Sequence, residues 1–176
     1  MISMKSLMKC FLYCICCLSL VTTIACRRGQ TNTDEAQLAA MEARFAEFEA
    51  KAAELPYIPM ETTDDGILVL ADSNFMEAVH AGGILVVDFW MDGCPPCEAM
   101  VPVVKELALH YKDQVSFGKL HANSNGLTAE KYGVRVFPTL LFFVDAKPVG
   151  YLQGWQSPER MRMVLDKLLR DRRDNP

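Results

Sequence analysis

A short stretch near the middle of the chain, residues 86–97, constrains the fold most. It reads Val-Val-Asp-Phe-Trp-Met-Asp-Gly-Cys-Pro-Pro-Cys, so an apolar run that contains one acid ends at a pair of cysteines. β-Branched and aromatic residues dominate the run and no helical period appears, which predicts a buried strand. A helical pattern opens at Cys97, and the cysteines therefore lie at a strand-to-helix turn. The free N–H groups and the dipole at a helix N-terminus favour a thiolate, so we expect the chemistry here.

The first 25 residues have the pattern of a secretory signal. Lys5 and Lys9 precede an apolar run over residues 10–21, which is shorter than the ~20 residues of a membrane-spanning helix. The following Ile24-Ala25-Cys26 resembles a bacterial lipoprotein processing site, although Thr23 stands where leucine is usual. This resemblance implies an exported protein that is lipid-anchored through Cys26 at the periplasmic face of a membrane. An uncleaved signal anchor and ordinary cleavage nearby are the alternatives.

Cysteine usage leaves one pair for chemistry. The chain has seven cysteines, and those removed with the signal are Cys10, Cys14, Cys16 and Cys17. A lipid would block Cys26, so Cys94 and Cys97 remain as an isolated pair in an exported protein. Neither a disulfide framework nor a four-cysteine zinc site can be built from one pair. Because the three histidines are scattered, we expect no metal site.

Length and charge exclude several other classes of protein. The 176 residues allow one domain plus extra segments, and a hydrophobic content of 51% is enough for a packed core. The formal net charge of −4 gives no reason to expect a nucleic-acid partner.

Residues 26–60 are interpreted as a polar tether followed by an amphipathic helix over about residues 34–54. Its apolar residues recur in alternating steps of three and four, at Leu38, Met41, Phe45, Phe48, Ala52 and Leu55. This seam is shorter than the ~3–4 heptads of a clear coiled coil. Three interpretations stay open: a helix that lies on its own domain or acts as a spacer, a homodimer contact through residues 34–55, or contact with a membrane surface.

A globular domain is expected over residues 61–176. Strands are predicted at residues 67–70, 84–90, 115–120, 139–144 and 149–152, with helices in the first three gaps and a last helix starting at Ser157 and Pro158. The first of these helices is expected to be capped by Asp72 or Ser73, and the helix after the cysteines to bury a stripe that includes Val101. This order predicts an α/β fold with a mixed central sheet and helices on both faces.

Residues 61–170 resemble thioredoxin. The features found in family order are Val87-Asp88-Phe89-Trp90, the cysteine pair, Pro102, Lys119, Phe137-Pro138-Thr139 and Gly154. The spacing from Cys94 to Pro138 leaves no room for the insertion of the longer periplasmic relatives in cytochrome maturation. The resemblance implies a thioredoxin fold in which Pro138 is cis and lies against the cysteines. It also implies that the backbone of Phe137 is free to pair with a substrate strand.

The resemblance assigns a role to each residue of the site. Cys94 is the attacking nucleophile, and Cys97 resolves the mixed disulfide by forming the Cys94–Cys97 bond. Asp88 accepts the proton of Cys97, because burial raises the pKa of a carboxylate toward neutrality. Lys119 is the partner of that acid and partly offsets its desolvation. No cofactor is implied beyond the redox-active disulfide.

Several positions around the cysteines are expected to contact substrate: Trp90, Gly93, Pro95, Pro96, Phe137, Pro138 and Gly154. Two of them depart from the family pattern, because Gly93 replaces the usual tryptophan and Pro95 replaces glycine. The loss of an aromatic cover at Gly93 predicts a rim that is either more open or differently recognised. Trp155 either borders the groove or packs on the surface.

These features predict a membrane-tethered thiol–disulfide oxidoreductase of the bacterial envelope that reduces disulfides in substrate proteins. Because the periplasm is kept oxidising, such a reductase needs an electron donor, such as a membrane-embedded thiol carrier. Disulfide oxidation or isomerisation is the alternative within the same chemistry. A second alternative is a non-catalytic binding module or metal carrier that uses Cys94 and Cys97 as ligands.

Overall fold

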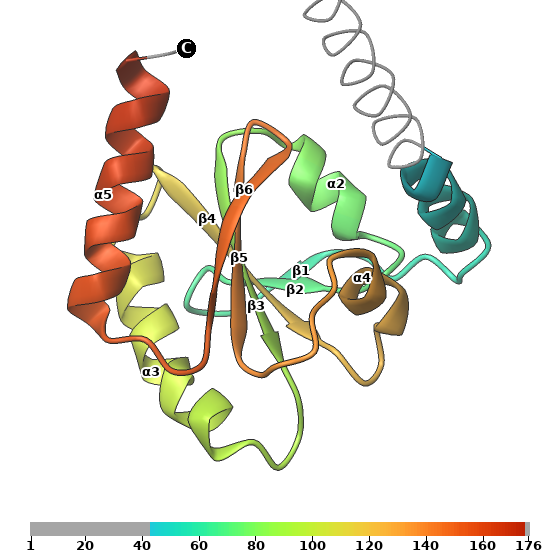
Figure 1. The fold of residues 1–176 in the computed structure, drawn as a ribbon, viewed down its shortest axis with the longest axis horizontal. Helices are drawn as coiled ribbons and strands as arrows, with labels where there is room; N and C mark the ends of the chain where they lie inside the picture. The colour runs from blue at the N-terminus through green and yellow to red at the C-terminus, as the bar shows by residue number, and fades with distance from the viewer. Residues whose placement is uncertain (1–42, 175–176) are drawn as a thin grey trace, which may run out of the picture. The chain divides into compact units, whose positions relative to one another are not determined.

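The structure, a computed structural model, describes residues 43–174 (Figure 1). Residues 43–53 are helical, and the compact unit of the chain begins at Glu47. The strands of this unit are β1 (Glu61–Thr62), β2 (Leu68–Leu70), β3 (Ile84–Trp90), β4 (Val115–His121), β5 (Thr139–Val144) and β6 (Lys147–Gln153). Its helices after residue 60 are α2 (Phe75–His80), α3 (Pro95–His110), α4 (Gly126–Lys131) and α5 (Pro158–Asp174).

The six strands form one mixed sheet in the order β1-β2-β4-β3-β5-β6. The central strand β3 pairs in parallel with β4 and antiparallel with β5, and β2 also runs parallel to β4. The strand predicted at residues 84–90 is confirmed to the residue. Its side chains are buried as far as Phe89, as expected of a strand covered on both faces.

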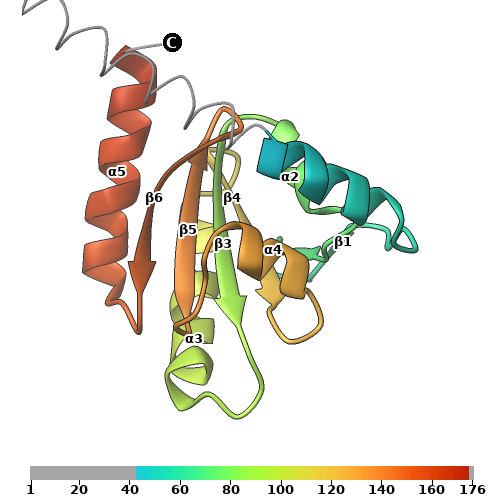
Figure 2. The same ribbon diagram turned by 45° about the vertical axis from the view of Figure 1, so that its right-hand side comes forward.

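Alternate residues of β3 supply the two hydrophobic cores on opposite faces of the sheet. Ile84 and Val86 belong to the core covered by α3 and α5, whereas Leu85, Val87 and Phe89 belong to the core covered by α2 and α4. Figure 2 shows these helix pairs on either side of the sheet. The predicted α/β class with helices on both faces is confirmed.

The first predicted helix starts later than expected and has a different cap. α2 begins after Asn74, whose side chain makes no capping hydrogen bond with the helix, and not after Asp72 or Ser73. The Asn74 Oδ1 instead accepts from the N–H of Ala71 at 2.8 Å. Asp72 is directed to another helix: its carboxylate accepts from the N–H groups of Leu127 (3.2 Å) and Thr128 (2.8 Å) in the first turn of α4.

The buried apolar face predicted for the helix after the cysteines, α3, is wrong at one position. Met100, Val104, Leu107 and Ala108 are buried as expected, but Val101 is 48% exposed. Each residue turns a helix by about 100°, so Val101 lies beside the face defined by Met100 and Val104 and not on it.

The hairpin predicted around residues 145–148 has a tighter turn. Only Asp145 and Ala146 connect β5 to β6, and both have positive φ angles, of 47° and 68°. Two such residues in succession are typical of the type I′ turn that suits the twist of a hairpin. Pro148 looks like a turn residue in the sequence but belongs to β6, an edge strand, where a proline is tolerated.

The described part of the N-terminal helix lies on its own domain from Glu47 onward. Phe48 is only 6% exposed, and the Nζ of Lys131 in α4 lies 4.0 Å from the centre of its ring. This contact fits the interpretation in which the helix packs on its own domain, and it places residues 47–60, assigned above to the tether and helix, within the compact unit. Pairing with a second copy through residues 34–55 stays a prediction.

The predicted signal, the lipidation residue Cys26, Leu38 and Met41 lie outside the described residues. Between residues 43 and 174, none of the helices has the length and apolar character needed to cross a membrane.

Candidate active site

The cysteine pair lies where β3 passes into α3. Cys94 is the N-cap residue of α3 and is bonded to Cys97, with the two Cα atoms 5.2 Å apart. Pro95 and Pro96 have no N–H, so the first donor of the helix belongs to Cys97. That N–H donates to the Sγ of Cys94 at 3.3 Å. The start of the helix therefore directs its donor at Cys94, the thiol that was expected to be the nucleophile.

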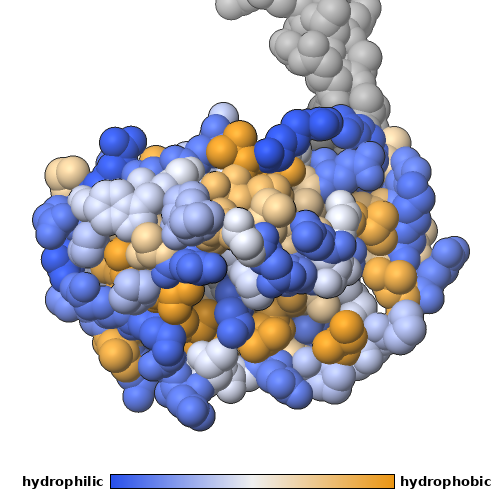
Figure 3. Space-filling view, turned by 90° about the horizontal axis from the view of Figure 1, so that it is seen from below, coloured by the Kyte–Doolittle hydropathy of each residue, from blue (hydrophilic) through white to orange (hydrophobic). Residues whose placement is uncertain are grey.

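Both sulfur-bearing residues are largely buried, and their exposure differs in the expected direction. Cys94 is 8% exposed and Cys97 is 3% exposed. Pro95 and Pro96 are exposed beside them. Cys94 is therefore the more accessible of the two to an incoming disulfide. The carboxyl end of β3 and the start of α3 lie at the bottom of Figure 1, and Figure 3 views the molecule from this side, where hydrophobic residues lie among hydrophilic ones.

A second loop of the site carries the cis peptide bond Phe137–Pro138. Its flanks are fixed from both sides. The Oγ1 of Thr139 donates to the carbonyl of Val136 at 2.6 Å, and the N–H of Gly154 donates to the carbonyl of Pro138 at 2.8 Å. Within the described residues, no hydrogen bond forms at the N–H or C=O of Phe137. Its backbone can therefore pair with an incoming extended segment, as the resemblance implied.

Asp88 is a buried acid behind the disulfide. It is 6% exposed, its Oδ1 has no hydrogen-bond partner among the described residues, and burial raises its pKa to about 7. A carboxyl group with this pKa can accept and release a proton near neutral pH, as the role proposed for it requires.

Lys119 lies beside Asp88 in the neighbouring strand. The two residues face each other across β3 and β4, and both line the same cavity. Within residues 43–174, Asp88 takes part in no ion pair, and burial raises its pKa. That Lys119 partly offsets the desolvation of Asp88 stays a prediction.

A cavity of about 440 Å³ connects these groups, and we term it the site cavity. Asp88, Lys119, Trp90, Gly93 and Cys97 all line it. Across its wall, Lys105 of α3 forms an ion pair with Asp65 (Nζ–Oδ2, 2.7 Å). The cavity gives Asp88 and the rear of the disulfide a common space through which water can exchange protons.

The loop before Cys94 has a gap at Gly93. Gly93 has a φ of +63°, and a Cβ built on it would meet nothing within 4 Å, so no side chain fills this position. Trp155 is 51% exposed and directly follows Gly154, whose N–H donates to the carbonyl of Pro138. The loop of Trp155 is held by Gln156, whose Nε2 donates to the carbonyls of Gln153 (2.9 Å) and Gly154 (3.3 Å). Trp155 therefore lies next to the cis-proline loop in the chain, and its contact with a substrate groove stays a prediction.

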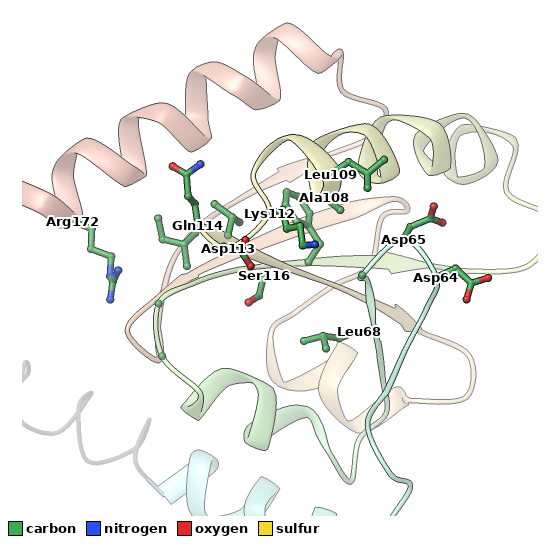
Figure 4. Close-up of a pocket in the computed structure, with 16 residues that line it drawn as sticks. Asp64, Asp65, Leu68, Ala108, Leu109, Lys112, Asp113, Gln114, Ser116 and Arg172 are labelled. Carbon is green, nitrogen blue, oxygen red and sulfur yellow. The ribbon is translucent and has the colours of Figure 1, made fainter.

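Another cavity, of about 540 Å³, lies at the far end of the sheet (Figure 4). It is lined by the first residues of β3 and β4 and by the end of α3, and charged groups of both signs surround it, such as Lys112, Asp113 and Arg172. No cysteine contributes to its wall, and it is not part of the site.

Two residues near the cysteines were not found from the sequence. The Nε2 of His121 at the end of β4 lies 3.1 Å from the Oδ2 of Asp92 in the loop before Cys94. They are 29 positions apart, and only the parallel register that sets Trp90 beside His121 brings them together. In the described region, no group of three or more His, Cys, Asp or Glu residues could hold a metal ion.

A mixed sheet with helices on both faces, a disulfide at the start of a helix, and a cis-proline just before the strand that pairs with the end of β3 define a thioredoxin-like redox fold. The family model of thioredoxin matches residues 66–167. Thioredoxin of Staphylococcus haemolyticus (strain JCSC1435) is 41% identical over 103 residues, which cover 58% of this chain and 98% of that protein. Thioredoxin of Staphylococcus aureus (strain Mu50 / ATCC 700699) is 40% identical over the same coverage. The chain belongs to the thioredoxin family.

Proposed function

We propose that this protein is a thiol–disulfide oxidoreductase that reduces disulfides in other proteins. The observation that carries this proposal is the Cys94–Cys97 disulfide at the start of α3, close to a buried carboxyl group whose pKa is about 7. The structure holds the oxidised form, which is the product of a reduction cycle.

The first step uses the reduced protein. The Cys94 thiolate attacks one sulfur of a substrate disulfide, forms a mixed disulfide and releases the other substrate sulfur as a thiolate, which takes a proton from water. The N–H of Cys97 and the helix dipole stabilise the attacking thiolate. The free N–H and C=O of Phe137 can hold the substrate segment as an added strand while the sulfurs align.

The second step releases the substrate. The Cys97 thiol gives its proton to Asp88, and its sulfur attacks the Sγ of Cys94. The Cys94–Cys97 bond forms, the mixed disulfide breaks, and the second substrate thiolate leaves and is protonated. Two electrons have passed from the protein to the substrate, and an external dithiol must return them. The site cavity lets the proton on Asp88 pass to solvent.

The location and electron supply follow from the N-terminal segment. We propose that Cys26 carries a lipid that holds the protein at the periplasmic face of a bacterial membrane, with a membrane-embedded thiol carrier as electron donor. The signal-like first 25 residues and the Ile24-Ala25-Cys26 end support this placement. Metabolic labelling with a radioactive fatty acid tests it: Cys26→Ala must abolish the label, and an unlabelled wild-type protein would contradict it.

Reduction of insulin by dithiothreitol tests the activity itself. Wild-type protein should accelerate the reaction, and Cys94→Ser should not. Cys97→Ser should accumulate a mixed disulfide with insulin, because attack remains while resolution is lost. A wild-type protein that gives no acceleration and copurifies with stoichiometric metal would instead favour the metal-carrier alternative.

The direction of transfer depends on the reduction potential of the Cys94–Cys97 couple. Equilibration with glutathione buffers measures it, and a potential near that of cytosolic thioredoxins, about −270 mV, fits a reductase. A potential near −120 mV would assign the protein to oxidation of substrates instead.

A further inference from the structure

His121 has a place beside the cysteine loop that the mechanism above leaves unused. It is the last residue of β4, and its ring centre lies 4.5 Å from that of Trp90. Its Nδ1 lies 2.9 Å from the Oγ of Ser124, and its carbonyl accepts from the Nδ2 of Asn125 at 2.9 Å. Trp90 and Ser124 therefore hold the imidazole ring, and Asn125 holds the backbone of His121.

The ring also faces Asp92, in the loop that leads to Cys94. The Nε2 of His121 is 3.1 Å from the Oδ2 of Asp92, and the side chains are 23% and 76% exposed, respectively. His121 is thus the fixed member of the pair. The Nε2 is buried, yet the contact is not aligned as a hydrogen bond. An unaligned contact attracts mainly through charge, so it is strongest when the imidazole is protonated.

Asp92 matters because of its position relative to the thiols. It precedes Cys94 by two residues and lines the site cavity together with Cys97. A negative charge near a thiol disfavours the thiolate, which is the reactive form. An Asp92 without a counter-charge would therefore make Cys94 a poorer nucleophile.

None of the other charged groups that line the site cavity neutralises the charge of Asp92 through an ion pair among the described residues. Asp88, Asp64 and Glu98 add negative charge, whereas Lys105 is paired with Asp65. Lys119 is the remaining cation of the wall, and it faces Asp88. Among the described residues, the ion pair formed by Asp92 is the one with His121.

We propose that His121 is a positioning residue that compensates the charge of Asp92 and thereby favours the thiolate form of Cys94. This inference rests on the proposed function, in which Cys94 is the nucleophile. His121 makes Cys94 reactive at a lower pH than the neighbouring carboxylates alone would allow.

The test is the pH dependence of Cys94 alkylation by iodoacetamide in the reduced full-length chain. Fragmentation of the peptide that carries both Cys94 and Cys97 in the mass spectrometer assigns the modification to each thiol separately. His121→Asn should raise the pH of half-maximal reactivity by about 0.3–0.5, which lowers the reactive fraction at neutral pH about two- to threefold. Asp92→Asn should lower that pH by a similar amount. His110→Asn, at the exposed far end of α3, is the matched control and should change nothing.

The double variant shows whether His121 acts through Asp92. In the Asp92→Asn background, His121→Asn should have less than a third of its effect in the wild type. An equal effect in both backgrounds, or unchanged reactivity in Asp92→Asn, would overturn the inference. Asp92 is exposed, so its variant keeps the test decisive even if His121→Asn folds poorly. Alkylation of Cys94 does not depend on whether the protein reduces a substrate disulfide. A protein that fails to reduce insulin would therefore contradict the proposed function without deciding this inference.

Discussion

Asp88 and Lys119 face each other across the two central parallel strands, yet they do not form an ion pair in the disulfide state. The carboxyl group is buried without a partner at its Oδ1, and burial raises its pKa to about 7. A buried acid without compensation destabilises the fold whenever it is charged. The protonation of Asp88 therefore affects both the stability of the domain and the proton transfer proposed for its reaction.

Replacing Asp88 with Asn should stabilise the oxidised protein at alkaline pH. An unfolded aspartate loses its proton near pH 3.9, whereas folded Asp88 keeps it to about pH 7. The folded state thus binds more protons between these values, and the free energy of unfolding falls as the pH rises through them. Asp88→Asn removes this fall and should add up to about 4 kcal/mol at pH 8, at about 1.4 kcal/mol per pH unit.

Urea denaturation at pH 4, 6 and 8 measures this effect. Asp171→Asn, an exposed acid of α5, is the control and should stay within about 0.5 kcal/mol of wild type throughout. Stability curves for wild type and Asp88→Asn that run parallel between pH 4 and 8 would show that Asp88 does not keep its proton on folding.

The same substitution should slow the second step of the reaction. Without the Asp88 carboxylate, the Cys97 thiol loses its buried proton acceptor, and general-base catalysis of this kind is worth about 10²-fold or more. Acid quenching and alkylation during turnover should show the mixed disulfide accumulating in Asp88→Asn, whereas the wild-type resolution rate should rise through about pH 7. Equal lifetimes of the mixed disulfide at all pH values would remove Asp88 from the mechanism.

The parts of the site that could be predicted are those with local signals. The strand from Ile84 to Trp90 is an apolar run that only Asp88 interrupts, and the cysteines follow it closely, so their places could be predicted from neighbouring residues. The helix at Pro158 was also predictable, because the Oγ of Ser157 caps it by accepting from the N–H of Arg160.

The parts that could not be predicted depend on residues far apart in the chain. β1 has two exposed residues and is a strand only because it pairs with β2. The contact of Asp92 with His121 requires the register between β3 and β4. The sequence also does not fix the distance between the charges of Lys119 and Asp88, because opposite positions in two strands bring backbones together but do not determine where a long, flexible side chain places its charge.

Trp155 should determine which substrates react fastest. An exposed indole next to the cis-proline loop can cover an apolar residue beside the attacked cysteine, and this cover is missing at Gly93. For two disulfide-linked peptides that differ only in Leu or Ser beside the cysteine, Trp155→Ser should slow reduction of the Leu peptide about three- to tenfold. The Ser peptide should react as before.

The matched control for Trp155 is Leu109→Ser, because Leu109 is an exposed apolar residue at the opposite end of α3 from the cysteines. It should leave both peptides unaffected. If Trp155→Ser slows reduction of the two peptides equally, the indole supports the loop and does not distinguish between substrates.

Asp72 should be a major source of stability despite its distance from the site. It is buried and accepts from the N–H and the Oγ1 of Thr128, at 2.8 and 2.5 Å, while its own N–H donates to the Oδ1 of Asn125 at 2.9 Å. Asp72→Ala leaves buried donors at the start of α4 without an acceptor, which should cost about 2–4 kcal/mol. Thermal unfolding at pH 7 measures this loss, and a change no larger than that of exposed Asp171→Ala would contradict it.

Phe48 separates the interpretations of the N-terminal helix. Its ring is buried in its own domain beneath the ammonium of Lys131, so Phe48→Ala should destabilise a single chain by about 1–3 kcal/mol. If the helix packs on its own domain, that loss should be the same at every protein concentration, because unfolding then involves one chain. Leu55→Ala, at a half-exposed position of the same predicted seam, is the control and should cost less. A helix that pairs two chains predicts otherwise: the effect of Phe48→Ala would grow as the protein is diluted, and sedimentation would show a dimer that is lost without residues 27–55.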